Sequence, residues 1–236
     1  MTLYSIILLC SIIVPFALSF DKKLQFYKQL KFLIPSTIFI ALFYIAVDVY
    51  FSKIGVWGFN PRYHSSIVLL HLPLEEWLFF IVIPYASIFL HDSISLYFTC
   101  FQLRESLSKK LTILLIILSL AVVLFNLDKL YTTYIFTLLL LVLLLSFFEK
   151  TKIINRYYLT FLVVLIPFVM VNALLTGSFL DEPVVWYTNS ETLGMRFLTI
   201  PVEDFGYAFS LILFNLFLRE KLKSKFSKSI KNLIEG

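Results

Sequence analysis

The sequence predicts an all-α, polytopic membrane protein with about seven transmembrane helices and a parallel internal repeat. Of its 236 residues, 60% are hydrophobic and 18% are aromatic, and the mean hydropathy is +0.90. Soluble domains are nearer half apolar. The apolar residues form long continuous runs, whereas the strands of a membrane barrel alternate between apolar and polar positions. A helical bundle is therefore the expected fold.

Seven stretches approach the roughly 20 apolar residues that a membrane-spanning helix needs. The expected spans are residues 2–20, 32–51, 73–91, 111–127, 130–148, 157–176 and 200–218. The first begins without a basic lead or a small-residue cleavage pattern, so we expect a retained helix rather than a signal peptide. Pro84 and Pro167 lie inside spans and predict kinks. Because the connectors are short, residues 1–236 are expected to form a single membrane domain.

The basic residues are distributed unevenly. Sixteen of the 20 Lys and Arg residues lie in alternate connectors, residues 21–31, 92–110 and 149–156, and in the tail, residues 219–236. By the positive-inside rule, this bias predicts a multi-pass protein of the cell membrane with its N-terminus outside and its C-terminus in the cytoplasm. The basic cytoplasmic tail is expected to contact lipid headgroups. Nucleic acid is not an expected partner.

Two regions of the chain share a pattern. A Trp-x-x-Asn motif, Trp57 to Asn60 and again Trp186 to Asn189, precedes a Pro-x-acid-acid motif in each region. The step from the first tryptophan to the second is one position longer than the step from Pro73 to Pro201, so a slippage of one position separates the copies. The predicted organisation is a first repeat over residues 1–91, a linking helix in residues 92–129 and a second repeat over residues 130–218.

A polar residue in the span before each tryptophan extends the repeat loosely. Asp48 has this place in the first copy and Asn172 in the second. Since four spans separate the third and seventh expected helices, both cross the membrane in the same direction. The two repeats are therefore expected to be parallel, related by an axis near the membrane normal.

The two acid pairs, Glu75–Glu76 and Glu203–Asp204, open the third and seventh spans. A structural role is open to them, because carboxylates in the first turn of a helix meet the positive end of its dipole. A functional role is favoured by three features. The pairs recur after the same motif, neither has a Lys or Arg within a helical turn, and ionisable groups at membrane depth tend to mark functional sites.

Only one acid of each pair can face the interior of the bundle, because adjacent helical residues point about 100° apart. Glu203 shares a stripe with Gly206, Tyr207 and Ser210, the more polar face of its helix. We therefore predict that Glu203, and by analogy Glu75, point inward. The second acids would then support them by hydrogen bonding or lie at the membrane interface.

A carboxylic acid in an apolar site favours its neutral form and can act as a proton donor. A polyene is an electron-rich substrate that is at home in lipid, and its protonation generates a carbocation that aromatic faces can stabilise. For any single aromatic residue, packing is the competing role, since the chain has 26 Phe. The candidate substrate-binding residues are Trp57, Asn60, Phe79, Phe80, Trp186, Asn189, Tyr207, Asp48 and Asn172.

The doubled motifs "PLEEWLFF" (73–80) and "PVEDFGYAF" (201–209), each preceded by Trp and Asn, resemble the membrane-integral lycopene cyclase domain of the heterodimer type. Both halves of that enzyme would be fused in this chain, and the resemblance covers nearly its whole length. The second copy departs from the pattern at Ser190, where the first has Pro61.

The resemblance implies a lycopene β-cyclase that forms β-rings from the acyclic ends of lycopene, giving β-carotene, an isomerisation without net redox change. It implies that Glu75 and Glu203 are acids or acid–base partners, with Glu76 and Asp204 beside them as further catalytic candidates. Lycopene and membrane lipids are the expected partners, and other carotenoid enzymes are candidate partners.

Other functions remain to be weighed. A small proton-coupled transporter fits parallel repeats with buried acids, although few polar residues are available to line an aqueous path. A cyclase for another carotenoid, or for one end only, is a closer alternative. A retinal-binding pump is excluded, because the last span has no Lys. The absence of a Gly-x-Gly-x-x-Gly loop and of metal-ligand His spacing predicts neither a cofactor nor a metal.

Overall fold

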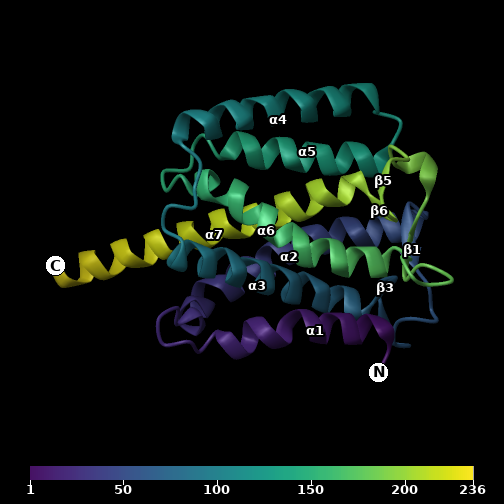
Figure 1. Ribbon diagram of the computed structural model, residues 1–236, viewed down its shortest axis with the longest axis horizontal. Coiled ribbons are helices and arrows are strands. Elements are labelled where there is room, and N and C mark those ends of the chain that lie inside the picture. Colours follow the sequence, from purple (N-terminus) through teal and green to yellow (C-terminus); the bar gives the residue numbers. More distant parts are fainter. Residues whose placement is uncertain (236) are drawn as a thin grey trace.

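Seven α-helices make up most of residues 1–235, the part of the chain that this computed structural model describes (Figure 1). They are α1 (Leu3–Leu18), α2 (Leu30–Ile54), α3 (Leu74–Tyr97), α4 (Glu105–Phe125), α5 (Leu130–Leu145), α6 (Ile153–Leu175) and α7 (Val202–Glu235). Two 3₁₀ turns, η1 (Phe26–Gln29) and η2 (Asn189–Glu191), complete the helical structure of this part. The all-α prediction is confirmed.

Four helical segments among the described residues are long and apolar enough to cross a membrane: α2 together with η1, α3, α4 and α6. Helices α1 and α5 are also apolar but have 16 residues each, or about 24 Å at 1.5 Å per residue. Large apolar side chains point outward along the helices, as a lipid-facing surface requires. They include Phe39, Leu42, Ile117, Leu162 and Ile166.

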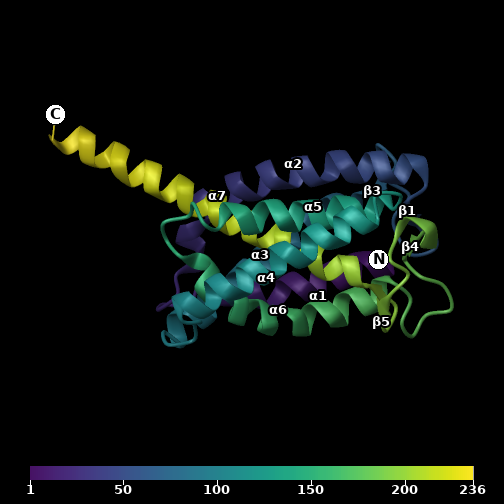
Figure 2. The ribbon, with the colours of Figure 1, turned by 90° about the horizontal axis from the view of Figure 1, so that it is seen from above.

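The bundle is built from two three-helix units with α4 at one edge (Figure 1). In each unit the outer helices pack together, α1 on α3 and α5 on α7. The middle helices cross over, because α2 packs on α7 and α6 packs on α3. Figure 2 shows α2 and α6 on opposite faces, with α3 and α7 between them. The two units thus share one interior.

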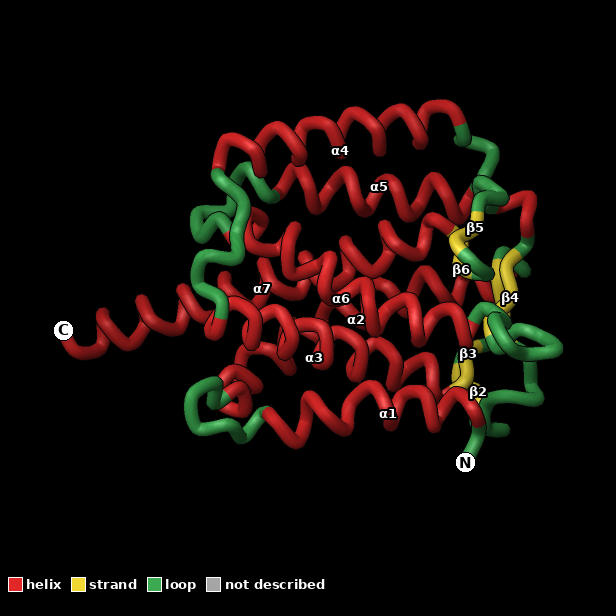
Figure 3. Tube along the Cα trace, viewed as in Figure 1, coloured by secondary structure: helices red, strands yellow, loops and turns green. Residues whose placement is uncertain are grey.

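The repeats are parallel, as predicted, because α1, α3, α5 and α7 all begin at the end of the bundle that carries the strands (Figure 3). At this end β1 (Trp57–Phe59) pairs antiparallel with β4 (Val185–Tyr187). Two hairpins lie beside them, β2 (Val68–Leu69) with β3 (Leu72–Pro73) and β5 (Arg196–Phe197) with β6 (Ile200–Pro201). Each hairpin leads directly into an acid-bearing helix.

The strand register corrects the predicted alignment of the repeats. Gly58 pairs with Trp186, and the residues on either side pair crosswise, Trp57 with Tyr187. Each position of the second hairpin follows its equivalent in the first by the same sequence offset, the one that separates Pro201 from Pro73. At this offset Trp186 is the counterpart of Gly58 and not of Trp57. A side chain at position 58 would come within 2.5 Å of the Trp186 ring, so glycine lets this ring cover the strand.

The opposite end of the bundle carries the basic connectors and a buried ion pair. Arg219 donates two hydrogen bonds to Asp92, Nη1 to Oδ2 at 2.6 Å and Nη2 to Oδ1 at 3.0 Å, and its side chain is 5% exposed. The predicted tail thus begins within α7, at a packed residue, and is helical to Glu235. Residue 236 lies outside the described residues.

Candidate active site

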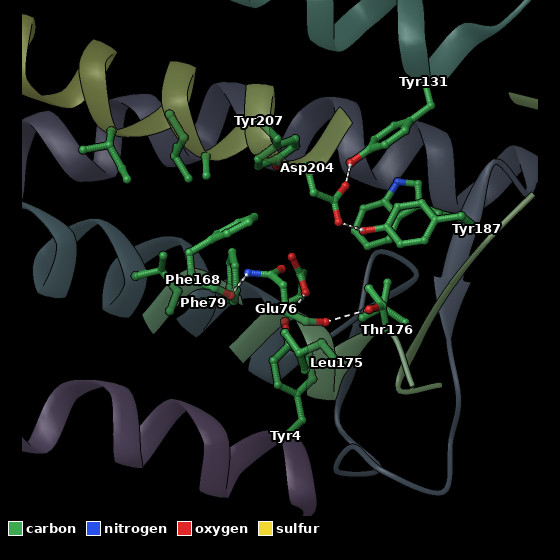
Figure 4. A pocket seen from close by; sticks show the side chains of 17 residues that line it. Tyr4, Glu76, Phe79, Tyr131, Phe168, Leu175, Thr176, Tyr187, Asp204 and Tyr207 are labelled. Carbon is green, nitrogen blue, oxygen red and sulfur yellow. Dashed lines mark hydrogen bonds between the residues drawn. The ribbon is translucent and has the colours of Figure 1, made fainter. Parts of the chain in front are cut away.

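A cavity of about 60 Å³ lies between α3 and α7, near the end that carries the strands (Figure 4). Its walls are mostly aromatic and aliphatic, and two carboxyl groups, Glu76 and Asp204, face into it. The lining residues are Tyr4, Trp57, Glu76, Phe79, Ile83, Tyr131, Phe168, Asn172, Leu175, Thr176, Val185, Tyr187, Asp204, Tyr207, Ala208, Leu211 and Ile212. Both repeats therefore contribute one acid to a single cavity.

Glu76 lies in the first turn of α3 and is 5% exposed. The hydroxyl of Tyr4, from α1, donates to its Oε2. None of the described residues donates a side-chain hydrogen bond to Oε1. One oxygen of Glu76 is thus fixed by the protein, and the other is free to carry a proton.

Asp204 lies in the first turn of α7 and is also 5% exposed. Tyr131 of α5 donates to its Oδ1 at 2.7 Å, and Tyr187 of β4 donates to its Oδ2 at 3.0 Å. Burial, reinforced by the neighbouring Asp204, raises the pKa of Tyr187 well above its ordinary value, so this phenol stays a donor at neutral pH. Both oxygens of Asp204 are held by tyrosines.

The first acids of the pairs, Glu75 and Glu203, are buried but do not line the cavity. They bind the loop that precedes their own helix. The backbone N–H of Ser65 donates to Glu75 Oε1 at 2.8 Å, and that of Leu193 donates to Glu203 Oε1 at 2.6 Å. Glu75 and Glu203 thus lie in the interior, as predicted, but all four acids are buried, and the two that reach the cavity are Glu76 and Asp204.

The helical stripe explains why Asp204, and not Glu203, reaches the cavity. The residues of α7 that line the cavity after Asp204 are Tyr207, Ala208, Leu211 and Ile212. This spacing of three and four residues defines one helix face. Gly206, which suggested the other face, instead packs against α5, where an added Cβ would lie 3.1 Å from Ile135. Its small size serves the contact between α5 and α7.

Four of the predicted substrate-binding residues line the cavity: Trp57, Phe79, Asn172 and Tyr207. The Trp57 ring stacks on Tyr187, with centroids 6.3 Å apart and an interplanar angle of 17°. Its Nε1 is buried and has no partner among the described residues. The Asn172 amide donates to the Phe168 carbonyl at 3.1 Å. Trp57 Nε1 is thus an unused donor in the wall.

The other five predicted substrate-binding residues do not line the cavity. Asn60 donates to Glu182 at 2.7 Å and Asn189 accepts from Arg196 at 3.1 Å, both at the surface of the strand end. Trp186 is 41% exposed. Phe80 and Asp48 are fully buried behind the wall, and both contact Tyr207.

The tyrosines that bind the acids are the residues that the sequence prediction missed. Tyr4 and Tyr131 occupy matching places, in "LYSI" (3–6) and "LYTT" (130–133) at the starts of α1 and α5. Extending the repeat search to these helices would have found them. Tyr187 follows Trp186 directly in the second motif, and its position opposite Trp57 depends on the pairing of β1 with β4.

This arrangement suits proton transfer in a largely apolar site. Two carboxyl groups meet one apolar cavity, and aromatic rings surround them. The carboxyl groups offer acid–base chemistry, and the rings offer stabilisation of positive charge. No group of three or more His, Cys, Asp or Glu in residues 1–235 is arranged to hold a metal ion.

The family profile of lycopene cyclase matches residues 1–94 and 128–222. The chain belongs to the lycopene cyclase family. The unmatched segment between the two regions contains α4, which links the repeats. No curated protein and no solved structure matches the chain. Membership supports an enzyme that cyclises a lipophilic carotenoid, and the match in two regions agrees with the repeated architecture.

Proposed function

We propose that the chain is a lycopene β-cyclase, which converts the acyclic ends of lycopene into β-ionone rings and forms β-carotene. The observation that carries this proposal is the pair Glu76 and Asp204, one from each repeat, on a single aromatic cavity. The reaction needs a proton donor, a proton acceptor and a site free of water, with no net oxidation or reduction.

Glu76 is the proton donor in this proposal. Its Oε2 is held by Tyr4, and Oε1 delivers a proton to the terminal double bond of the polyene. A C–H bond forms as the π bond breaks, leaving a tertiary cation. An internal double bond then attacks this cation, so that the ring C–C bond closes and the positive charge moves into the ring.

Asp204 is the counter-charge and the proton acceptor. With Tyr131 and Tyr187 fixing both oxygens, it presents an oriented negative charge to the ring cation. It takes the proton whose loss places the double bond in the ring. Lycopene thus gains one proton and loses one, and Glu76 must regain a proton before the next ring forms. The rings of Trp57, Phe79 and Tyr207 supply aromatic faces, each contributing about 0.5–2 kcal/mol to a desolvated cation.

The remaining predictions fit this proposal. The basic residues lie mostly in connectors at the end opposite the strands, which favours a cytoplasmic C-terminus in the cell membrane and an acid-bearing end near the outer surface. Lipids surround the bundle, and other carotenoid enzymes are the expected source of its substrate. Because both acids belong to one cavity, the two ends of lycopene would react in turn.

The test is expression in a host that accumulates lycopene, followed by chromatography of the pigments. Wild-type protein is expected to produce β-carotene. Accumulation of a monocyclic pigment would identify a cyclase for one end only. Unchanged lycopene in membranes that contain the folded protein would contradict the proposal.

Isosteric variants test the roles of the acids. Glu76→Gln and Asp204→Asn remove the transferable proton or its acceptor, and each is expected to lower ring formation by about 10²-fold or more. Glu75→Gln and Glu203→Gln are the matched controls, because these acids lie outside the cavity, and they should retain most activity per folded molecule. Full activity in both Glu76→Gln and Asp204→Asn would refute these assignments.

A further inference from the structure

Asp48 is a third buried acid near the cavity, and the proposed reaction does not use it. It lies in α2, is 0% exposed, and is not part of the cavity wall. Tyr207 donates to its Oδ2 at 2.9 Å, while Oδ1 is buried with no partner among the described residues. A buried carboxyl without a cation costs free energy, so its presence calls for a function.

The tyrosines of the cavity wall share one feature, since each donates its hydroxyl to a carboxyl oxygen. Tyr4 donates to Glu76, Tyr131 and Tyr187 donate to Asp204, and Tyr207 donates to Asp48. In the first three cases the acceptor itself lines the cavity. Only the Tyr207 hydroxyl is held by a residue behind the wall.

The Tyr207 ring is fixed as well as its hydroxyl. Tyr44 packs edge-on against it with centroids 5.1 Å apart, and Phe80 lies 6.3 Å away. Tyr44 is itself anchored by donating to Ser210 at 2.9 Å. These contacts, together with the bond to Asp48, aim the phenol oxygen toward α2 and leave the ring for the cavity.

The opposite wall has no such pair. At the shift that takes Pro73 to Pro201, the counterpart of Tyr207 is Phe79, which carries no hydroxyl. Asn172 occupies the place that loosely matches Asp48, and its amide is bound to its own helix. Tyr207, on one wall, thus has an acid behind it, whereas its counterpart Phe79 has Asn172 in the matching place.

We infer that Asp48 is a positioning residue that keeps the Tyr207 oxygen away from the reacting carbocation. This inference rests on the proposed function. A phenol oxygen that is free to turn onto a tertiary cation can capture it, whereas the hydroxyls of Tyr4, Tyr131 and Tyr187 are each held against a carboxyl group of the cavity. If the phenol turned inward, a C–O bond would form, its O–H bond would break, the proton would pass to Asp204, and the chain would end as an aryl ether of its own substrate. Bound to Asp48, Tyr207 offers its ring instead.

The experiment measures self-alkylation during turnover. We would incubate purified wild-type, Asp48→Asn and Asp48→Leu proteins with lycopene in liposomes. Mass spectrometry then measures the mass of the peptide that contains Tyr207. Asp48→Leu removes both acceptor atoms, so we expect this peptide to gain the mass of one carotenoid as ring formation stops early. Asp48→Asn leaves one acceptor atom, so less adduct per turnover is expected. Wild type should show none.

The double variant Asp48→Leu/Tyr207→Phe is expected to lack the adduct and to form more rings per chain than Asp48→Leu alone. Asn215→Leu is the matched control, because it removes another fully buried polar side chain of the bundle and should leave Tyr207 unmodified. If Asp48→Leu fails to fold, Asp48→Ala, which also removes both acceptor atoms, decides. Sustained turnover without adduct in the folded variant that lacks both acceptor atoms would overturn the inference.

The outcomes separate this inference from the proposed function. Wild-type protein that forms no ring refutes the cyclase itself. Wild-type protein that forms rings, together with an Asp48 variant that loses activity without an adduct and without recovery by Tyr207→Phe, refutes only the role of Asp48.

Discussion

The first and second repeats place their acids by the same backbone arrangement but surround them differently. In each repeat, a tyrosine at the start of the first helix binds the cavity acid, Tyr4 with Glu76 and Tyr131 with Asp204. In each, the backbone N–H ten residues before the other acid donates to that acid. The scaffold is thus duplicated down to single hydrogen bonds.

The number of partners separates the repeats. Glu75 accepts from Thr2, Ser5 and the Ser65 hydroxyl, each at 2.9 Å, in addition to the Ser65 amide. Among the described residues, Glu203 accepts only from Thr132 and the Leu193 amide, and its Oε2 is buried without a partner. In the cavity the order is reversed, with two tyrosines on Asp204 and one on Glu76. Duplication fixed where the acids lie, and side-chain changes made the two halves chemically unequal.

The largest difference between the repeats is expected in stability. Glu75→Ala leaves the Ser65 amide and the hydroxyls around it without their acceptor, and should lower the free energy of unfolding by about 2–4 kcal/mol. Glu203→Ala strands fewer donors and also removes an unsatisfied oxygen, so about 1 kcal/mol is expected. Thermal unfolding in detergent micelles measures both. Equal losses would show that the side-chain donors around Glu75 contribute nothing.

The tyrosine contacts should produce the next largest difference, in activity. Tyr4→Phe removes the side-chain donor of Glu76 and is expected to lower ring formation about tenfold, which corresponds to about 1.4 kcal/mol. Tyr187→Phe leaves Tyr131 on Asp204, so a loss of a few fold is expected. Tyr158→Phe, whose hydroxyl contacts Thr112 away from the cavity, is the control.

The effect of Tyr187→Phe should not depend on pH in the neutral range. Because burial and Asp204 raise the pKa of Tyr187, this phenol keeps its proton well past neutrality and donates throughout. The ratio of wild-type to Tyr187→Phe activity is therefore expected to be constant between about pH 6 and 9. A ratio that falls toward one at the alkaline end would show that Tyr187 loses its proton there.

The bundle could be predicted from the sequence because its cause is local. Continuous apolar runs specify helices in lipid, where each backbone group must be satisfied within its own segment. The predicted positions of the helix ends were less accurate. Helix α3 continues to Tyr97 and α7 to Glu235. The ion pair between Asp92 and Arg219 holds the first polar turn of each helix beyond its apolar run.

The candidate site was predicted only in part, because its geometry is not local. The motif identified both acid pairs, but the choice within each pair depended on which face of α7 meets α5, a packing contact that Gly206 makes with Ile135. Asn60 and Asn189 belong to the same recurring motif, yet they bind loop residues. Recurrence identifies what a duplicated fold needs, and this includes its loops as well as its cavity.

One further variant converts the loop of the first repeat toward that of the second. Ser65→Ala removes the hydroxyl hydrogen bond to Glu75 Oε2 and keeps the backbone hydrogen bond to Oε1. The loop of the first repeat would then bind its acid through a backbone N–H at this position, as Leu193 does in the second repeat. A loss of about 1 kcal/mol in unfolding free energy is expected, with the product unchanged.

Ser66→Ala, at the neighbouring position, is the control for Ser65→Ala and should be neutral. If Ser65→Ala were as damaging as Glu75→Ala, the hydroxyl rather than the amide would hold the loop. The second repeat, which has no hydroxyl at this position, would then need another explanation for its order. If only the smaller loss is seen, the backbone bond shared by both repeats is the one that fixes each acid-bearing helix.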